Sequence, residues 1–70
     1  MTDERFMKLV GKRVRQLRLQ KGLTQDDMAK HFEYRYYQRI EHGDRNISLK
    51  ILNRLSKALG VPAMELFRFE

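Results

Sequence analysis

Three long polar side chains near the middle of the chain share one side of a predicted helix. Arg35, Gln38 and Arg39 recur at helical spacing between residues 34 and 42. An arginine can donate two N–H groups to O6 and N7 of guanine, and a glutamine can pair at two points with N6 and N7 of adenine. With the flat, amphipathic ring of Tyr34, these side chains could contact base edges in the major groove of DNA. On their spacing alone a solvated helix face is the simpler interpretation, and DNA contact stays open beside it.

A helix that enters a groove must have its opposite side fixed to the rest of the protein. Tyr37 and Ile40 lie three residues apart and Tyr36 and Ile40 four apart, which predicts one buried side for residues 34–42. Gly43 is expected to end this helix. The segment therefore has an apolar back and a polar front.

Two helices are predicted before it. Thr2 is a predicted N-cap, and the first helix runs to Gly22. Its apolar stripe is Phe6, Val10, Val14 and Leu17. Thr24 is expected to cap a second, short helix that ends near His31 or Phe32. The residues of this helix expected to face inward are Met28, Ala29 and Phe32.

Two more helices are predicted after Gly43. Asp44 to Ile47 form a loop, and Ser48 caps a fourth helix that ends at Gly60. Its predicted apolar stripe is Leu49, Leu52, Leu55, Ala58 and Leu59. Pro62 suits the first turn of a fifth helix running to about Phe67. Since no segment alternates as a strand would, we expect a compact all-α domain of five helices, with a helix-turn-helix formed by the second and third.

The 70-residue chain carries 15 Lys or Arg against 9 Asp or Glu, for a net charge of +6. This balance favours an anionic partner such as nucleic acid, although it also fits an ordinary soluble domain. The sequence has no cysteine, and no spacing of Ser, His or carboxylates indicates catalysis or a metal site. No apolar run approaches the roughly 18 residues of a membrane span. We therefore expect a single cytoplasmic domain over residues 1–70, without enzymatic activity, metal or cofactor.

Several separate motifs follow one another along almost the whole chain. They are Leu-Thr-Gln-Asp-Asp-Met-Ala at residues 23–29, Arg-Ile-Glu at 39–41, Gly43, Arg-Asn at 45–46, Ser-Leu at 48–49 and Ala-Leu-Gly-Val at 58–61. In this order they resemble the lambda-repressor-like helix-turn-helix family (Cro and repressor, xenobiotic-response-element type) over about residues 6–67. The resemblance implies a sequence-specific transcriptional regulator of prokaryotic or phage origin that binds double-stranded DNA.

The resemblance also implies roles for individual residues. The base-reading positions of the family match Tyr34, Arg35, Gln38 and Arg39. Gln25, at the start of the second helix, resembles a residue that hydrogen-bonds a DNA phosphate. Arg45 and Asn46 match the loop that contacts the DNA backbone. Arg18 and Glu41 match a charged pair that joins the first helix to the end of the third.

One feature departs from the family pattern. The distance from Ala29 to Ile40 is about two residues shorter than usual, and no glycine lies between Gly22 and Gly43. Either the second helix is shortened at its C-terminal end or the turn itself is tightened. The assignments at Glu33 and Tyr34 lie next to this gap, so their positions depend on which of the two occurs.

The apolar C-terminal segment suggests a second copy of the chain as a partner. Pro62, Leu66, Phe67 and Phe69 are expected to form the interface of a two-fold homodimer. The alternative is that these side chains close the core of one subunit. A different function also stays open at this point, a protein-interaction module such as the antitoxin of a toxin–antitoxin pair.

Overall fold

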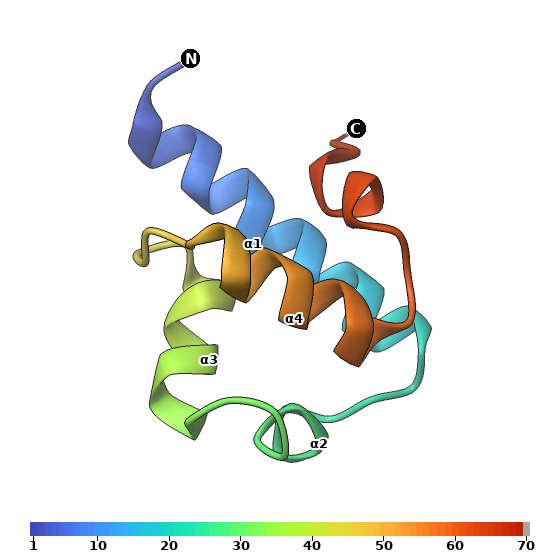
Figure 1. Ribbon diagram of the computed structural model, residues 1–70. Coiled ribbons are helices and arrows are strands. Elements are labelled where there is room, and N and C mark those ends of the chain that lie inside the picture. The colour runs from blue at the N-terminus through green and yellow to red at the C-terminus, as the bar shows by residue number, and fades with distance from the viewer. Residues whose placement is uncertain (70) are drawn as a thin grey trace.

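The computed structural model describes residues 1–69, which form four α-helices and one 3-10 helix (Figure 1). In chain order these are α1 (Asp3–Gln20), α2 (Gln25–Met28), α3 (Tyr34–His42), α4 (Leu49–Leu59) and the 3-10 helix η1 (Ala63–Phe67). The long helix α1 contacts α3, α4 and η1, while α2 packs on α3. The predicted all-α class is confirmed. Within residues 1–69, no helix is both long and apolar enough to cross a membrane.

The predicted N-caps begin three of these helices. The hydroxyl of Thr24 accepts a hydrogen bond from the backbone N–H of Asp27 at 3.0 Å, and the Asp27 carboxylate accepts one from the N–H of Thr24 at 2.8 Å. Thr2 and Ser48 cap α1 and α4 through their hydroxyls in the same manner. These bonds satisfy N–H groups that have no partner within the helix.

A single core joins all of the elements. Its buried apolar side chains are Val10, Val14, Leu17, Met28, Phe32, Tyr37, Ile40, Leu55, Leu59 and Leu66. Two expectations were wrong. Ala29 lies at the C-cap of α2 and is exposed, and Leu49 is 83% exposed. At 100° per residue, Leu49 falls about a quarter turn away from the stripe centred on Leu55 and Leu59, while Ile51 packs against the core instead.

The expected fifth α-helix is a 3-10 helix, so the prediction of five α-helices was wrong by one. Pro62 precedes η1 as its N-cap, and the carbonyl of Pro62 accepts from the N–H of Glu65 at 2.9 Å. Arg13 of α1 anchors the segment, because its Nε donates to the Glu65 carbonyl at 2.8 Å and its Nη2 to the Glu65 carboxylate at 3.1 Å. Such short terminal segments commonly adopt the tighter 3-10 winding.

The predicted end of the second helix near His31 or Phe32 was wrong, because α2 ends at Met28 and the segment from Ala29 to Glu33 connects it to α3. Regular helix stops at Met28, whose carbonyl accepts from the N–H groups of His31 and Phe32 at 2.9 and 3.2 Å. No residue other than glycine among those described has a positive φ, so this turn needs no glycine. Phe32 is buried at its end, with its ring centroid 5.7 Å from that of Tyr37. The missing residues are thus taken from the C-terminal end of the second helix.

Candidate nucleic-acid interface

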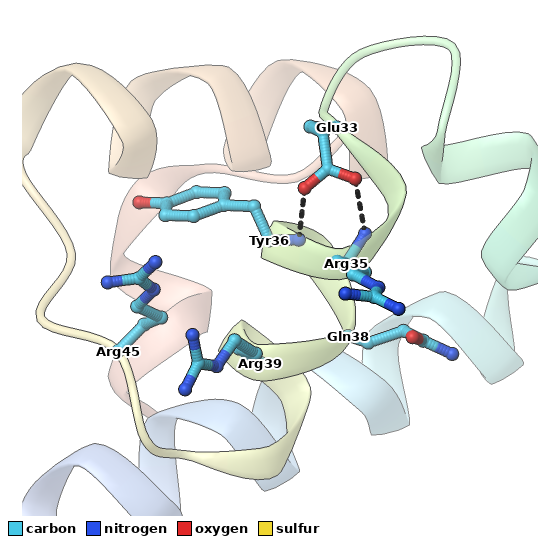
Figure 2. A pocket seen from close by; sticks show the side chains of 6 residues that line it. All are labelled: Glu33, Arg35, Tyr36, Gln38, Arg39 and Arg45. Carbon is cyan, nitrogen blue, oxygen red and sulfur yellow. Dashed lines mark hydrogen bonds between the residues drawn. The ribbon is translucent and has the colours of Figure 1, made fainter.

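Helix α3 has one buried side and one open side. Tyr37 and Ile40 are buried in the core, whereas Arg35, Gln38 and Arg39 are exposed. Figure 2 shows Arg39 pointing toward Arg45 on one flank of the helix and Gln38 pointing toward the other flank. The open side therefore presents long donors and acceptors over the breadth of the helix.

The open side of α3 borders a hollow of about 560 Å³. Its lining consists of Glu33, Arg35, Tyr36, Gln38, Arg39 and Arg45 (Figure 2). The lining thus contains three guanidinium groups and one carboxylate. That carboxylate is occupied, because Glu33 caps α3 by accepting from the backbone N–H groups of Arg35 at 2.8 Å and Tyr36 at 3.0 Å. The hollow suits a negatively charged ligand that approaches α3 from solvent.

Two arginines of the hollow are oriented by weak contacts. The Arg45 guanidinium lies over the ring of Tyr36, 5.5 Å from its centroid, which is within cation–π range. Arg39 Nε lies 3.7 Å from Asp44 Oδ1, and both side chains are about half exposed. An exposed pair of this kind contributes at most about 1 kcal/mol. Arg39 can therefore exchange Asp44 for another acceptor at little cost.

The predicted pair between α1 and α3 is formed and shielded from solvent. Arg18 Nε donates to Glu41 Oε2 at 2.6 Å and Arg18 Nη2 to Glu41 Oε1 at 3.2 Å, with side chains 8% and 4% exposed. Arg18 also donates to the Leu23 carbonyl at 2.9 Å, which fixes the segment before α2. The hydroxyl of Tyr37 donates to Glu41 Oε2 as well. One carboxylate thus joins α1, α3 and the approach to α2.

These contacts shift the pKa values of the groups involved. Burial disfavours the charged form of Glu41, but hydrogen bonds from Arg18, Tyr37 and Gln25 together outweigh it and hold the pKa of Glu41 below its ordinary value. Burial raises the pKa of Tyr37, and its hydrogen bond to Glu41 raises it further. The hydrogen bond to Glu41 raises the pKa of Arg18. The group is therefore an ion pair with a neutral phenol near neutral pH.

The buried carboxylate also orients two glutamines at the surface. Because a charged Glu41 only accepts, Gln25 presents its Nε2 inward, 3.1 Å from Glu41 Oε1. Its amide oxygen then accepts from Nε2 of Gln38 at 3.4 Å. Gln25 is thereby placed directly beside the open side of α3.

Three of the predicted DNA-contacting residues, Tyr34, Gln25 and Asn46, do not line the hollow on α3. Tyr34 lies with Gln25 and Arg15 along a shallow depression between α1, α2 and α3. Asn46 is exposed and borders a second, mostly apolar hollow of about 240 Å³. That hollow is lined by Phe6, Met7, Val10, Arg45, Asn46, Ile47, Leu52 and Phe67. Arg45 borders both hollows, so the loop after α3 separates them.

The predicted dimer residues have unequal exposure. Leu66 is completely buried within the chain, so it belongs to the core and has no surface left for a partner. Phe67 stacks on Phe6 with centroids 6.1 Å apart, yet 42% of Phe67 is exposed. Phe69 packs edge-on against Phe6 at 5.8 Å and is half-buried, while Pro62 is exposed. Leu66 therefore closes the core of its own subunit, as in the alternative to a dimer interface given above.

The sequence does not indicate that Glu33 and Tyr36 line the hollow on α3. Glutamate is not among the favoured N-cap residues, yet Glu33 caps α3. The spacing from Ile40 indicates only a partly buried side for Tyr36. Its contact with Arg45 depends on the path of the following loop, for which the sequence has no signal.

Comparison with known proteins assigns the family. The helix-turn-helix family model matches residues 14–66 of this chain. The chain belongs to the helix-turn-helix family. Control protein C.BamHI from Bacillus amyloliquefaciens is 41% identical over 64 residues, covering 87% of this chain and 79% of that protein. The assignment confirms the family that the motifs predict.

Two solved structures share this helix-turn-helix fold. The restriction-modification controller protein C.AhdI from Aeromonas hydrophila superposes with a TM-score of 0.83 at 36% identity, covering 87% of this chain and 96% of that chain. The DNA-binding domain of BldD superposes with a TM-score of 0.85 at 26% identity, covering 97% and 100% of the two chains. The chain is therefore a DNA-binding transcriptional regulator with a helix-turn-helix fold.

Proposed function

We propose that this helix-turn-helix regulator places α3 in the major groove of double-stranded DNA and reads base edges with Arg35, Gln38 and Arg39. The groove is about 12 Å wide and admits one helix. The observation that carries the proposal is the division of α3 into a buried side, held by Tyr37 and Ile40, and an open side with three long polar side chains. Tyr34 would contact the duplex beside Gln25 at the N-terminal end of α3.

Contacts with phosphates would hold the helix in register. Gln25 is suited to this role because its hydrogen bond with Gln38 ties it to the reading surface. Arg45 borders the same hollow from the loop after α3, and Asn46 follows it in the sequence. Such contacts add affinity for any sequence, whereas the contacts made by Arg35 and Arg39 discriminate between sequences.

A two-fold dimer would extend this small interface. A single module of this size buries only about 600–1,000 Å² of protein surface on DNA, and two copies would double that area. The C-terminal segment supports a dimer contact, because Met64 and Phe67 are exposed apolar side chains in the stretch from Pro62 to Phe69. Leu66 is left out of this surface.

The relatives support a proposal for the biological setting. C.BamHI and C.AhdI are bacterial control proteins by name, and we place this chain in the bacterial or phage cytoplasm as a non-enzymatic regulator of transcription. This family membership favours DNA binding over the alternative of an antitoxin-like interaction module.

Selection of binding sites from random-sequence duplexes tests the proposal. We expect enrichment of one site with two-fold symmetry and half-sites about 34 Å apart. Arg35→Ala and Arg39→Ala should each cost about 1–3 kcal/mol on the selected duplex and much less on random duplex. Gln25→Ala should weaken binding to both duplexes alike. Failure to enrich any sequence would refute the proposal, and an asymmetric site would refute the dimer.

A further inference from the structure

A row of exposed cations on α1 has no assigned role. Lys8, Lys12 and Arg15 lie four and three residues apart and therefore share one face of the helix. All three are exposed, and none of them takes part in an ion pair within residues 1–69. We call these three residues the α1 basic stripe.

The stripe lies where α1 crosses the C-terminal end of α3. Gly11 is buried at this crossing, because a Cβ there would lie 2.4 Å from the Ile40 carbonyl oxygen and 2.7 Å from that of Glu41. The crossing continues at Gly43, where a Cβ would lie 2.6 Å from the Cα of Lys8. At the other end of the stripe, Arg15 shares a depression with Gln25 and Tyr34. The stripe thus runs from the end of α3 to the start of α2.

The helical positions place the stripe on the solvent side of this crossing. Around α1, the core residues Val10 and Val14 lie on one side of Gly11, and the stripe lies on the other. Around α3, the buried Ile40 lies on one side of Glu41, and Gln38 lies on the other. The stripe and the open side of α3 therefore belong to one continuous surface.

We propose that the α1 basic stripe binds the phosphate backbone of the same duplex, along the edge of the groove nearest to Gln25. This inference rests on the proposed function and lengthens its footprint with three cations not counted among the DNA contacts above. Charge complementarity supports this proposal. The three cations of the stripe outnumber the two neighbouring carboxylates, Asp26 beside Arg15 and Glu4 one turn before Lys8, in a chain of net charge +6. Contacts of this kind release condensed counterions, so each one steepens the salt dependence of binding.

The test compares two variants with the same change in charge. Lys8→Gln/Lys12→Gln removes two cations of the stripe. Lys30→Gln/Lys57→Gln removes two exposed lysines from the α2–α3 turn and from α4. Binding is measured by fluorescence anisotropy on a random-sequence duplex of about 30 base pairs, long enough for two half-sites one helical turn apart, across a range of salt concentrations. Circular dichroism confirms that both variants fold.

We expect the stripe variant to reduce the log–log salt slope by about 1.8 per subunit, since each phosphate contact contributes about 0.9. If the curves meet at 1 M salt, this corresponds to a loss of roughly 60-fold at 0.1 M. The control variant should change the slope by less than about half a unit. Arg15→Gln alone should reduce the slope by about 0.9.

Two different failures can be told apart. In the first, wild-type protein binds DNA with a steep salt slope, but the slope of the stripe variant equals that of the wild type or of the control variant. This result would overturn the inference and leave the proposed function standing. Wild-type protein that binds neither random nor selected duplex would overturn the proposed function, and the inference with it.

Discussion

The buried pair of Arg18 and Glu41 should dominate the stability of the surface that would meet DNA. Glu41→Gln keeps the size of the side chain but removes its charge, which leaves the Arg18 guanidinium uncompensated with only the Leu23 carbonyl as a second acceptor. Removing one partner of a buried pair typically costs about 3–5 kcal/mol. A 70-residue domain has a total stability of roughly 4–10 kcal/mol, so this change should remove about half of it.

Urea unfolding followed by circular dichroism measures the loss. With a slope of about 1 kcal/mol per molar urea, a loss of about 3–5 kcal/mol should lower the midpoint by about 3–5 M. The double variant Arg18→Met/Glu41→Gln removes both charges, and it should cost at least about 2 kcal/mol less than the sum of the single changes. The exposed pair of Arg39 and Asp44 is the matched control, for which Arg39→Met and Asp44→Asn should each cost less than about 1 kcal/mol. Single changes at Arg18 and Glu41 that are equally small and additive would show that the two charges are not a coupled, buried pair.

Two further predictions concern the glycines and acid pH. Gly22→Ala should cost about 1–2 kcal/mol through its positive φ alone, whereas Gly43→Ala should cost more, because a Cβ there meets the Cα of Lys8 at 2.6 Å; equal losses in urea unfolding would contradict the close approach. The pKa of Glu41 is lower in the folded chain than its ordinary value of 4.5, so its contribution to stability is complete above pH 4.5 and is lost as the pH falls through the folded pKa. Asp27, whose pKa is lowered by its capping hydrogen bonds, acts in the same direction. The urea concentration at the unfolding midpoint should therefore decrease as the pH is lowered below 4.5. A midpoint that stays constant down to pH 3 would count against the ion pair.

Local signals in the sequence predicted most of the helix boundaries. Thr24 and Ser48 are caps because a short hydroxyl side chain reaches back to the helix N–H groups. The predicted bounds of α3, residues 34–42, match the structure, and Gly43 ends the helix with a φ of +81°. These features depend on a few neighbouring residues, which the sequence displays directly.

Features that depend on packing over longer distances were harder to predict. The apolar pattern of η1 fits an α-helix as well as a 3-10 helix, and its hydrogen bond with Arg13, 52 positions before Glu65, has no signal in the sequence. Leu49 matched the apolar stripe by residue type, yet it lies about a quarter turn from the centre of the stripe and is exposed. The contact between Arg45 and Tyr36 depends on how a loop folds back.

Amide chemical-shift mapping on the isotope-labelled protein, titrated with the selected duplex, locates the surface that contacts DNA. We expect the largest shifts at Arg35, Gln38 and Arg39 on the open side of α3, with further shifts at Gln25 and in the loop at Arg45. Shifts concentrated instead at the far end of α4, with the open side of α3 unaffected, would contradict the placement of α3 in the major groove.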